Sequence, residues 1–393
     1  MRAELNYAVM LTSAILSLSL GGCSGSGNSS SQGEKLVIGS VIPLSGPMGH
    51  YGEDDKAGME IAREELNSQG ILVKESSGST KKYSVDIRHE NSYGGPNNTV
   101  NAPEQLEKLA SSGVNAVVGE QGSGVTLALA PVANARRVVL ITPAATNYKL
   151  RDAGPWVFRM LPNDYDQAVR MARYGRDQLK SNRAAILSID NDYGRDLNKT
   201  FVESFSSSGG SIVFNRQFSE GQKEFSGLLT DLAKSNAQFL FLVGHTQEMA
   251  DLLRTKERIE KKTGRVLPVL GTDGMYDETF IKQVGPSSEG IVLASAGFNP
   301  ESEEPAVKRF VTLFRAKYGK TPSLWSASSY DAILLIAEAI RRGGPAAEAI
   351  RTNLLQVRVP GATGLNYFDS TGGISGKEVY VFIIRSGHFA RVN

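Results

Sequence analysis

The four histidines of the chain do not form a catalytic or metal-binding pattern. They are His50, His89, His245 and His388. No two of them have the short helical spacing that brings metal ligands together. The sequence also lacks a G-x-S-x-G nucleophile motif and a G-x-x-x-x-G-K-[ST] phosphate loop. We therefore expect the histidines to be surface or loop residues, and we expect no catalysis, no metal and no cofactor.

Two weaker motifs do not change this expectation. Ser79 and Lys82 have the S-x-x-K spacing, but they fall in a polar turn without the partner motifs of that chemistry. Gly122-Ser-Gly124 follows an apolar run but lacks the third glycine of the dinucleotide fingerprint. A nucleotide-using α/β enzyme is therefore the weakest alternative for this sequence.

The stretch from Val117 to Asn147 has the residues of a small-molecule cradle. Two apolar runs, each typical of a buried strand, end in small polar loops, Gly119-Glu-Gln-Gly-Ser-Gly124 and Thr142-Pro-Ala-Ala-Thr-Asn147. Ligands bind beyond the carboxyl ends of strands in open parallel sheets. A helix that begins at the first loop offers free N–H groups and its positive dipole end, which suits an anion. Thr146 adds a hydroxyl beside the Ala144 carbonyl.

Similar loops follow strands in the second half of the chain, and a cleft between two lobes is a favoured place for a small ligand. Six loops in all carry small residues, hydroxyls, two aromatic residues and carboxylates. They are residues 45–51, 119–126, 144–147, 192–193, 244–246 and 272–273.

Alternating strands and helices predict an α/β protein with two similar lobes. Each lobe is expected to be a parallel-type sheet with helices on both faces, and several chain crossings should form the hinge. We predict a first lobe of residues 34–162 plus 297–360 and a second of 163–296 plus 361–393. Candidate hinges are Pro162, residues 294–297 and residues 359–364. The 393 residues suffice for two cores, and 43 basic against 41 acidic residues give no support to nucleic-acid binding.

The N-terminus is predicted to be a lipoprotein signal peptide. Arg2 precedes an apolar region too short to span a bilayer, which ends in Leu20-Gly-Gly-Cys23 and so matches the bacterial lipobox. Residues 1–22 would be removed, Cys23 would be lipidated, and residues 23–33 would form a flexible tether. The alternative is a plain secretory signal with an incidental cysteine. Cys23 is the only cysteine, so an intrachain disulfide is impossible.

Along the mature chain the sequence resembles the type I periplasmic substrate-binding proteins, and above all the leucine/isoleucine/valine-binding family of ABC transporters. The resemblance is carried by motifs in matching order: Ile38-Gly-Ser40, Leu44-Ser-Gly-Pro47, Tyr51-Gly52, Val117-Val-Gly119, Ile141-Thr-Pro-Ala-Ala-Thr-Asn147, Asp192-Tyr-Gly194, Phe225-Ser226 and Gly271-Thr-Asp-Gly274. It implies a monomer, held outside the cytoplasmic membrane by its lipid, that binds a small amino acid and delivers it to a membrane permease.

The resemblance also implies a role for each site residue. Ser123 would hold the ligand carboxylate, and Thr146 would contact both the carboxylate and the ammonium group. The Ala144 carbonyl would accept from the ammonium group, Asp273 would supply its countercharge, and Tyr193 would close over the ligand. Tyr51 would line the side-chain pocket, with His245 at a position where the family often has an aromatic residue.

Each of these residues also has a purely structural interpretation. Ser123 and Thr146 could cap helices, Tyr51 and Tyr193 could be core aromatics, and Asp273 could be a turn residue before a glycine. Asp273 replaces the family's usual glutamate. Receptors for amides, urea or aromatic acids, and a ligand sensor of the same fold, therefore stay open as alternatives. The sequence assigns no role to Glu120 or Gln121.

Overall fold

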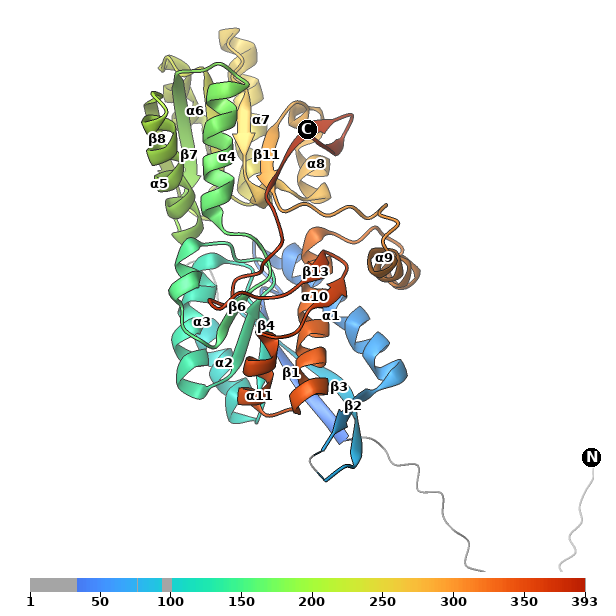
Figure 1. The fold of residues 1–393 in the computed structure, drawn as a ribbon. Helices are drawn as coiled ribbons and strands as arrows, with labels where there is room; N and C mark the ends of the chain where they lie inside the picture. The colour runs from blue at the N-terminus through green and yellow to red at the C-terminus, as the bar shows by residue number, and fades with distance from the viewer. Residues whose placement is uncertain (1–33, 76, 94–100, 393) are drawn as a thin grey trace, which may run out of the picture. The chain divides into compact units, whose positions relative to one another are not determined.

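The computed structural model describes residues 34–75, 77–93 and 101–392. The predicted signal peptide, Cys23 and the tether lie outside these residues. The described chain forms two large sheets with their helices and one two-stranded sheet (Figure 1). This confirms the predicted fold class of two α/β lobes.

The first lobe is built on a six-stranded sheet in the order β2-β3-β1-β4-β5-β6. All neighbours are parallel except β2 and β3, which are antiparallel at one edge. The strands are β1 (Glu34–Ile42), β2 (Ile71–Lys74), β3 (Thr80–Asn91), β4 (Ala116–Gly119), β5 (Val139–Thr142) and β6 (Val157–Arg159). The helices are α1 (Gly49–Gln69), α2 (Asn101–Ser111), α3 (Ser123–Arg136), α9 (Pro305–Tyr318), α10 (Leu324–Gly343) and α11 (Ala347–Leu354).

The alternating directions of the side chains along the short strand β4 show why helices cover both faces of this sheet. Successive side chains of a strand point to opposite faces. Val117 packs in one core with residues of α2 and α3, whereas Val118 packs in the other with residues of α1 and α10. Both valines are fully buried. The strand therefore needs apolar side chains throughout, as the continuous apolar run predicts.

The second lobe is built on a seven-stranded sheet in the order β15-β14-β11-β10-β9-β7-β8. Its first five strands along the chain pair in parallel, and β14 and β15 complete one edge as an antiparallel hairpin. The strands are β7 (Arg183–Ile189), β8 (Ser211–Phe218), β9 (Phe239–Val243), β10 (Val269–Gly271), β11 (Val292–Ser295), β14 (Tyr380–Arg385) and β15 (His388–Arg391). The helices are α4 (Asp164–Asp177), α5 (Asp192–Ser207), α6 (Ser226–Lys234), α7 (Thr246–Thr263) and α8 (Glu278–Val284).

The chain passes between the lobes three times (Figure 1). The first passage joins β6 to α4 through Pro162, and the second joins β11 to α9. The third lies later than predicted. Residues 359–366 form a hairpin of β12 (Val359–Gly361) and β13 (Gly364–Asn366), and Ala362 and Phe368 pack in the core of the first lobe. The chain therefore leaves that lobe only after Ile374, and residues 359–364 are not a hinge.

Close contact between α1 and α10 brings the start of each helix to the cleft. A Cβ atom at Gly58 of α1 would lie 1.9 Å from the carbonyl oxygen of Ser326 in α10. Only glycine permits this approach. It places Tyr51, near the start of α1, beside Trp325, the second residue of α10, with ring centroids 5.7 Å apart.

Candidate functional site

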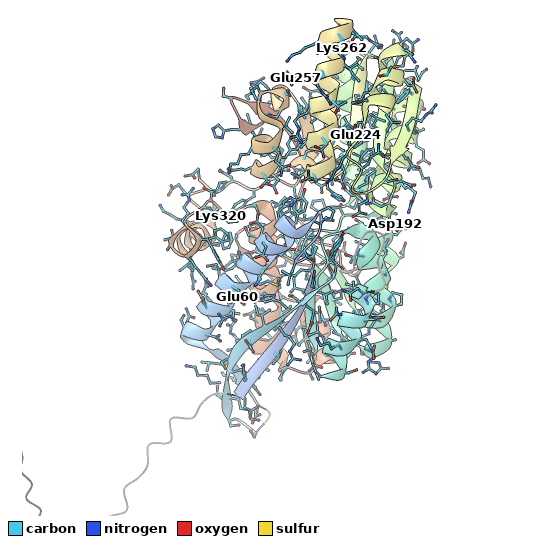
Figure 2. All side chains as sticks on the ribbon, turned by 180° about the vertical axis from the view of Figure 1, so that it is seen from behind. Glu60, Asp192, Glu224, Glu257, Lys262 and Lys320 are labelled. Carbon is cyan, nitrogen blue, oxygen red and sulfur yellow. The ribbon has the colours of Figure 1, made fainter. Side chains whose placement is uncertain are left out.

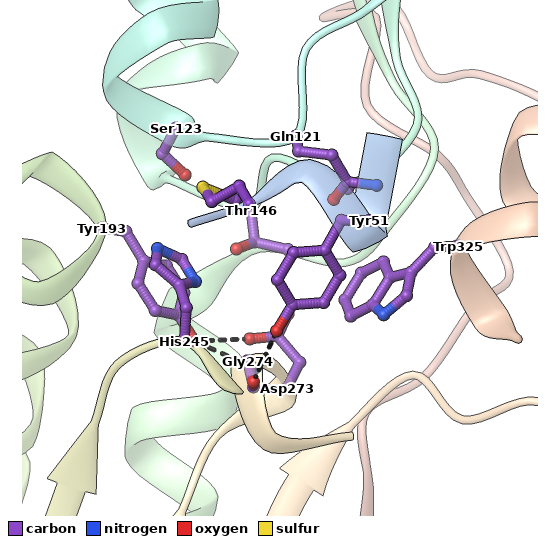
Figure 3. A pocket seen from close by; sticks show the side chains of 11 residues that line it. Tyr51, Gln121, Ser123, Thr146, Tyr193, His245, Asp273, Gly274 and Trp325 are labelled. Atoms are coloured by element: carbon purple, nitrogen blue, oxygen red, sulfur yellow. Dashed lines mark hydrogen bonds between the residues drawn. The ribbon is translucent and has the colours of Figure 1, made fainter. Parts of the chain in front are cut away.

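The carboxyl ends of six parallel strands converge on one pocket between the lobes (Figure 3). The first lobe contributes the segments after β1, β4 and β5, and the second contributes those after β7, β9 and β10. The pocket has about 330 Å³ of empty space, including its open side. All seven predicted ligand-binding residues line it: Tyr51, Ser123, Ala144, Thr146, Tyr193, His245 and Asp273. The remaining lining residues are Met48, Gln121, Gly274 and Trp325.

The first-lobe half of the pocket presents hydroxyl and backbone N–H groups. Ser123 is the first residue of α3, so its N–H belongs to the free donors at the helix N-terminus. Its hydroxyl accepts a hydrogen bond from the Asn147 N–H at 3.3 Å. Gly122 is the N-cap of α3, and Asn147 caps the following 3₁₀ turn, so neither Ser123 nor Thr146 serves as a side-chain cap there. This half is suited to an anion.

The second-lobe half presents a buried carboxylate. Asp273 is 4% exposed. Its Oδ1 accepts from the Tyr193 hydroxyl at 2.7 Å, and its Oδ2 accepts from the Gln167 amide at 2.8 Å. Tyr193 itself is held by α5, whose N-cap Asn191 accepts from the Gly194 N–H at 3.0 Å. The aspartate is thus fixed in position by its neighbours and is more than a turn residue.

Burial makes ionisation of the Asp273 carboxyl group less favourable. Loss of water raises the pKa of Asp273, and the hydrogen bonds from Tyr193 and Gln167 oppose that shift. Both donors are neutral, so they satisfy the oxygens without cancelling the charge. A buried carboxylate in this state is stabilised by a cation brought to it.

Aromatic rings form a third part of the wall, which the close-up shows around Tyr51 (Figure 3). The Tyr51 ring meets Trp325 edge to face, and His245 stacks on Tyr193 with centroids 5.2 Å apart and an interplanar angle of 18°. Such pairs keep rigid, largely apolar surfaces in place. A ligand side chain could lie against them.

The two lobes are in direct contact around the pocket. The Tyr51 hydroxyl donates to the Gly274 carbonyl at 3.1 Å and lies 2.8 Å from the Thr246 hydroxyl. On another side, the Asn147 amide donates to the Asp192 carbonyl at 2.8 Å. Figure 2 shows Asp192 where the lobes meet. The structure is therefore a closed form, in which first-lobe and second-lobe groups face the same small space.

Trp325 is the lining residue that sequence reasoning missed most clearly. It is 4% exposed and comes from a helix that follows a crossing, not from a loop at a strand end. Tryptophan at the start of a helix is an ordinary core residue, so the sequence carries no distinguishing signal. Met48 lies inside the predicted loop of residues 45–51, and Gly274 directly follows that of residues 272–273, but the sequence predicts a ligand contact for neither.

The structure separates the roles of Glu120 and Gln121. Gln121 lines the pocket and donates to Asp55 at 2.7 Å. Glu120 lies behind it, accepting from the Ser92 hydroxyl at 2.6 Å and from the Gly122 N–H at 2.5 Å. Burial raises the pKa of Glu120 to about 7.

The described part of the chain holds neither a metal-ligand cluster nor a membrane-spanning helix. Among those residues, no three histidine, cysteine or acidic side chains are grouped as metal ligands. None of the helices in the same residues combines the length and the apolar character needed to cross a bilayer.

Comparison with known proteins decides the family. The model of the periplasmic binding protein family matches residues 35–388. The chain belongs to this family. A Leu/Ile/Val/Thr-binding protein of Salmonella typhimurium is 25% identical to this binding protein over 89% of the chain and 91% of the relative. A Leu/Ile/Val-binding protein homolog of Brucella melitensis is 27% identical over 79% of each.

Solved structures agree with the fold. A leucine-binding protein of Thermotoga maritima superposes with a TM-score of 0.81 at 25% identity, covering 91% of this chain and 98% of the other. A branched-chain amino acid transporter protein of Streptococcus pneumoniae, in complex with isoleucine, gives 0.80 at 26% identity, with 91% and 99% covered. The predicted relationship to branched-chain amino acid binding proteins is confirmed, and this chain is a substrate-binding protein.

Proposed function

We propose that this binding protein captures a small amino acid outside the cytoplasmic membrane and presents it to the permease of an ABC importer. The observation that carries the proposal is the opposed polarity of the pocket. Hydroxyl and N–H donors lie on one lobe, around Ser123 and Thr146, and the Asp273 carboxylate lies on the other. The names of the relatives support an amino acid with an aliphatic side chain.

An amino acid zwitterion would pair with the polar groups of both halves of the pocket at once. Its carboxylate would accept from the Ser123 hydroxyl and from the Ser123 and Thr146 N–H groups. Its ammonium group would donate to Asp273, to the Ala144 carbonyl and to the Thr146 hydroxyl. Charge-assisted hydrogen bonds of this kind offset the cost of taking both charges out of water. Tyr51, Trp325 and His245 would enclose the side chain.

Closure of the lobes would couple binding to transport. Asp273 and Tyr193 reach the ligand only when the lobes meet, so a ligand with both charges favours the closed form. Domain closure of this kind is a known property of periplasmic binding proteins. The permease would then recognise the closed surface, while the lipid on Cys23 keeps the protein near the membrane.

A thermal-shift screen of the mature domain tests the ligand class. The panel holds aliphatic amino acids, their amides, urea and aromatic acids. A ligand at 100 times its dissociation constant stabilises the protein by about 2.7 kcal/mol, which is readily detected. We expect the largest shift with an aliphatic amino acid. A shift only with amides or aromatic acids would contradict this ligand class.

Membrane attachment is tested separately with Cys23→Ala. The variant is expected to lose lipid labelling and to appear in the soluble fraction, while the purified domain keeps its ligand binding. Unchanged membrane association of the variant would contradict the lipid anchor.

A further inference from the structure

A second buried carboxylate, that of Asp164, lies behind Asp273 and outside the lining of the pocket. Asp164 is the first residue of α4 and is fully buried. The amide nitrogen of Gln167 donates to Oδ2 of Asp273 at 2.8 Å and also lies 3.4 Å from Oδ1 of Asp164. The two carboxylates thus share one neutral donor. Oδ2 of Asp164 has no hydrogen-bond partner among the described residues.

The orientation of this bridge is fixed. The Asp273 N–H donates to the side-chain oxygen of Gln167 at 3.0 Å, so the amide nitrogen of Gln167 must face the two carboxylates. The Asp164 N–H donates to the Thr146 carbonyl at 2.9 Å, which ties the start of α4 to the predicted ammonium contact. Asp164 therefore belongs to the same subsite as Asp273, although it does not line the pocket itself.

The charge of Arg159 offsets that of the pair only in part, since it opposes the upward shift that burial causes in the pKa of Asp164. Arg159 lies on the Asp164 side, but its guanidinium donates to the Asn147 carbonyl at 3.3 Å and makes no ion pair with Asp164 within 4 Å. Asp196 adds a further negative charge on that side. His245 and the Tyr193 hydroxyl face Asp273.

Two carboxylates that share one neutral amide donor in a water-poor site disfavour each other's ionisation. We propose that Asp164 and Asp273 share one proton while the cleft holds no ligand, and that the ammonium group of an entering amino acid displaces this proton to solvent. The inference rests on the proposed function. The direction of the pKa shifts agrees, since burial raises the pKa of both groups and Asp273 raises that of Asp164 further.

The exchange balances in charge and in hydrogen bonds. The protonated pair carries one negative charge. After the carboxyl O–H has given its proton to buffer, the pair carries two, and the ammonium group returns the total to one negative charge. The carboxyl O–H that the pair loses as a hydrogen-bond donor is replaced by an ammonium N–H. A neutral ligand that brings no cation would leave the proton in place, so the exchange discriminates against such ligands.

The first test uses the protein without ligand. Aspartate carboxyl carbons are labelled with ¹³C and followed by NMR from pH 5 to 8. We expect one proton on the pair at pH 6 in the wild type, and its loss in Asp164→Asn, where Asp273 has no competing carboxylate. Asp231→Asn, an exposed position on α6, is the control and should leave the signals of the pair unchanged. Full ionisation of both carboxylates at pH 6 would overturn the proposal.

The second test is calorimetric titration with L-leucine at pH 7 in buffers of low and high ionisation enthalpy. We expect release of close to one proton per ligand in the wild type and much less in Asp164→Asn. Binding of leucine with no proton release in the wild type would overturn the proposal. Absence of leucine binding would count against the proposed ligand class, and the NMR titration would still decide whether the proton is shared.

Discussion

The two halves of the pocket are built from different chemistry on similar scaffolds. In each lobe the residues follow the carboxyl ends of parallel strands. The first lobe supplies hydroxyl and N–H groups at the start of α3, whereas the second supplies Asp273 and the rings of Tyr193 and His245. Under the proposed function the first lobe contacts both charged groups of a zwitterion, but only the second lobe supplies a countercharge for the ammonium group. Selectivity for charge and closure of the lobes would then depend on the same contact, that with Asp273.

Removal of the second-lobe charge should have the largest effect. Asp273→Asn keeps the shape and hydrogen-bonding capacity of the side chain but removes the countercharge of the ammonium group. We expect a loss of about 3 to 4 kcal/mol in binding free energy, since a buried charge would be left unpaired. Calorimetry with the best ligand of the screen measures it. Asp277→Asn, a buried aspartate outside the pocket, is the matched control. Equal affinity in Asp273→Asn and the wild type would remove this residue from the site.

Glu120, which lies behind the first-lobe half of the pocket, should make the stability of the protein depend on pH. Its pKa is about 7 in the folded protein, raised from 4.5 by burial. Below pH 4.5 the group is neutral in both states. As pH rises from 4.5 to 7 the unfolded chain loses the proton first, so the free energy of unfolding falls, by about 3 kcal/mol in all from this group.

Glu120→Gln should remove this part of the pH dependence. Urea unfolding at pH 5 and pH 8 measures it in variant and wild type. The wild type should lose more stability between the two pH values than the variant. The same loss in both proteins would show that Glu120 ionises normally.

Loss of the Thr146 hydroxyl tests the proposed contact with the ammonium group. Thr146→Ala should weaken binding about tenfold, or by about 1.4 kcal/mol, since one charge-assisted hydrogen bond is lost. Thr146→Ser keeps the hydroxyl and is expected to bind nearly as well as the wild type. If alanine and serine bind equally well, the hydroxyl does not contact the ligand.

The smallest effect is expected at the contact between the halves. Tyr51→Phe keeps the ring beside Trp325 but removes the hydroxyl that bonds the Gly274 carbonyl and the hydroxyl and N–H of Thr246, at a net cost of about 1 kcal/mol. Affinity should fall a few-fold, measured by calorimetry. Tyr83→Phe, a buried tyrosine in β3 far from the cleft, is the control. An unchanged dissociation constant would mean that the bond does not favour closure.

Much of this pocket could be predicted because the ends of the strands can be recognised in the sequence. Ser123, Thr146 and Asp273 all follow short apolar runs, and parallel sheets place such residues along one edge. Glycine and proline mark where the strands stop. The order of these loops along the chain therefore predicts which residues meet.

The rest depends on packing between elements that are distant in sequence. Trp325 reaches the pocket only because Gly58 lets α10 lie against α1. Asp164 and Gln167 lie on α4, which follows the first passage between the lobes. No sequence pattern predicts that they contact Asp273. Short elements such as β2, α8 and α11 carry too little periodicity to be predicted, and residues 359–364, predicted as a hinge, lie in the hairpin of β12 and β13.

The hydrogen bond from Tyr51 to Gly274 affects how long a ligand stays bound as well as how tightly it binds. Pocket residues such as Thr146 and Asp273 are nearly inaccessible to solvent in the closed form. A bound molecule therefore leaves only after the lobes part, and the rate of opening sets an upper limit on its rate of departure. The lifetime of the loaded protein therefore depends on bonds between the lobes, such as that from Tyr51 to Gly274, as well as on the bonds to the ligand.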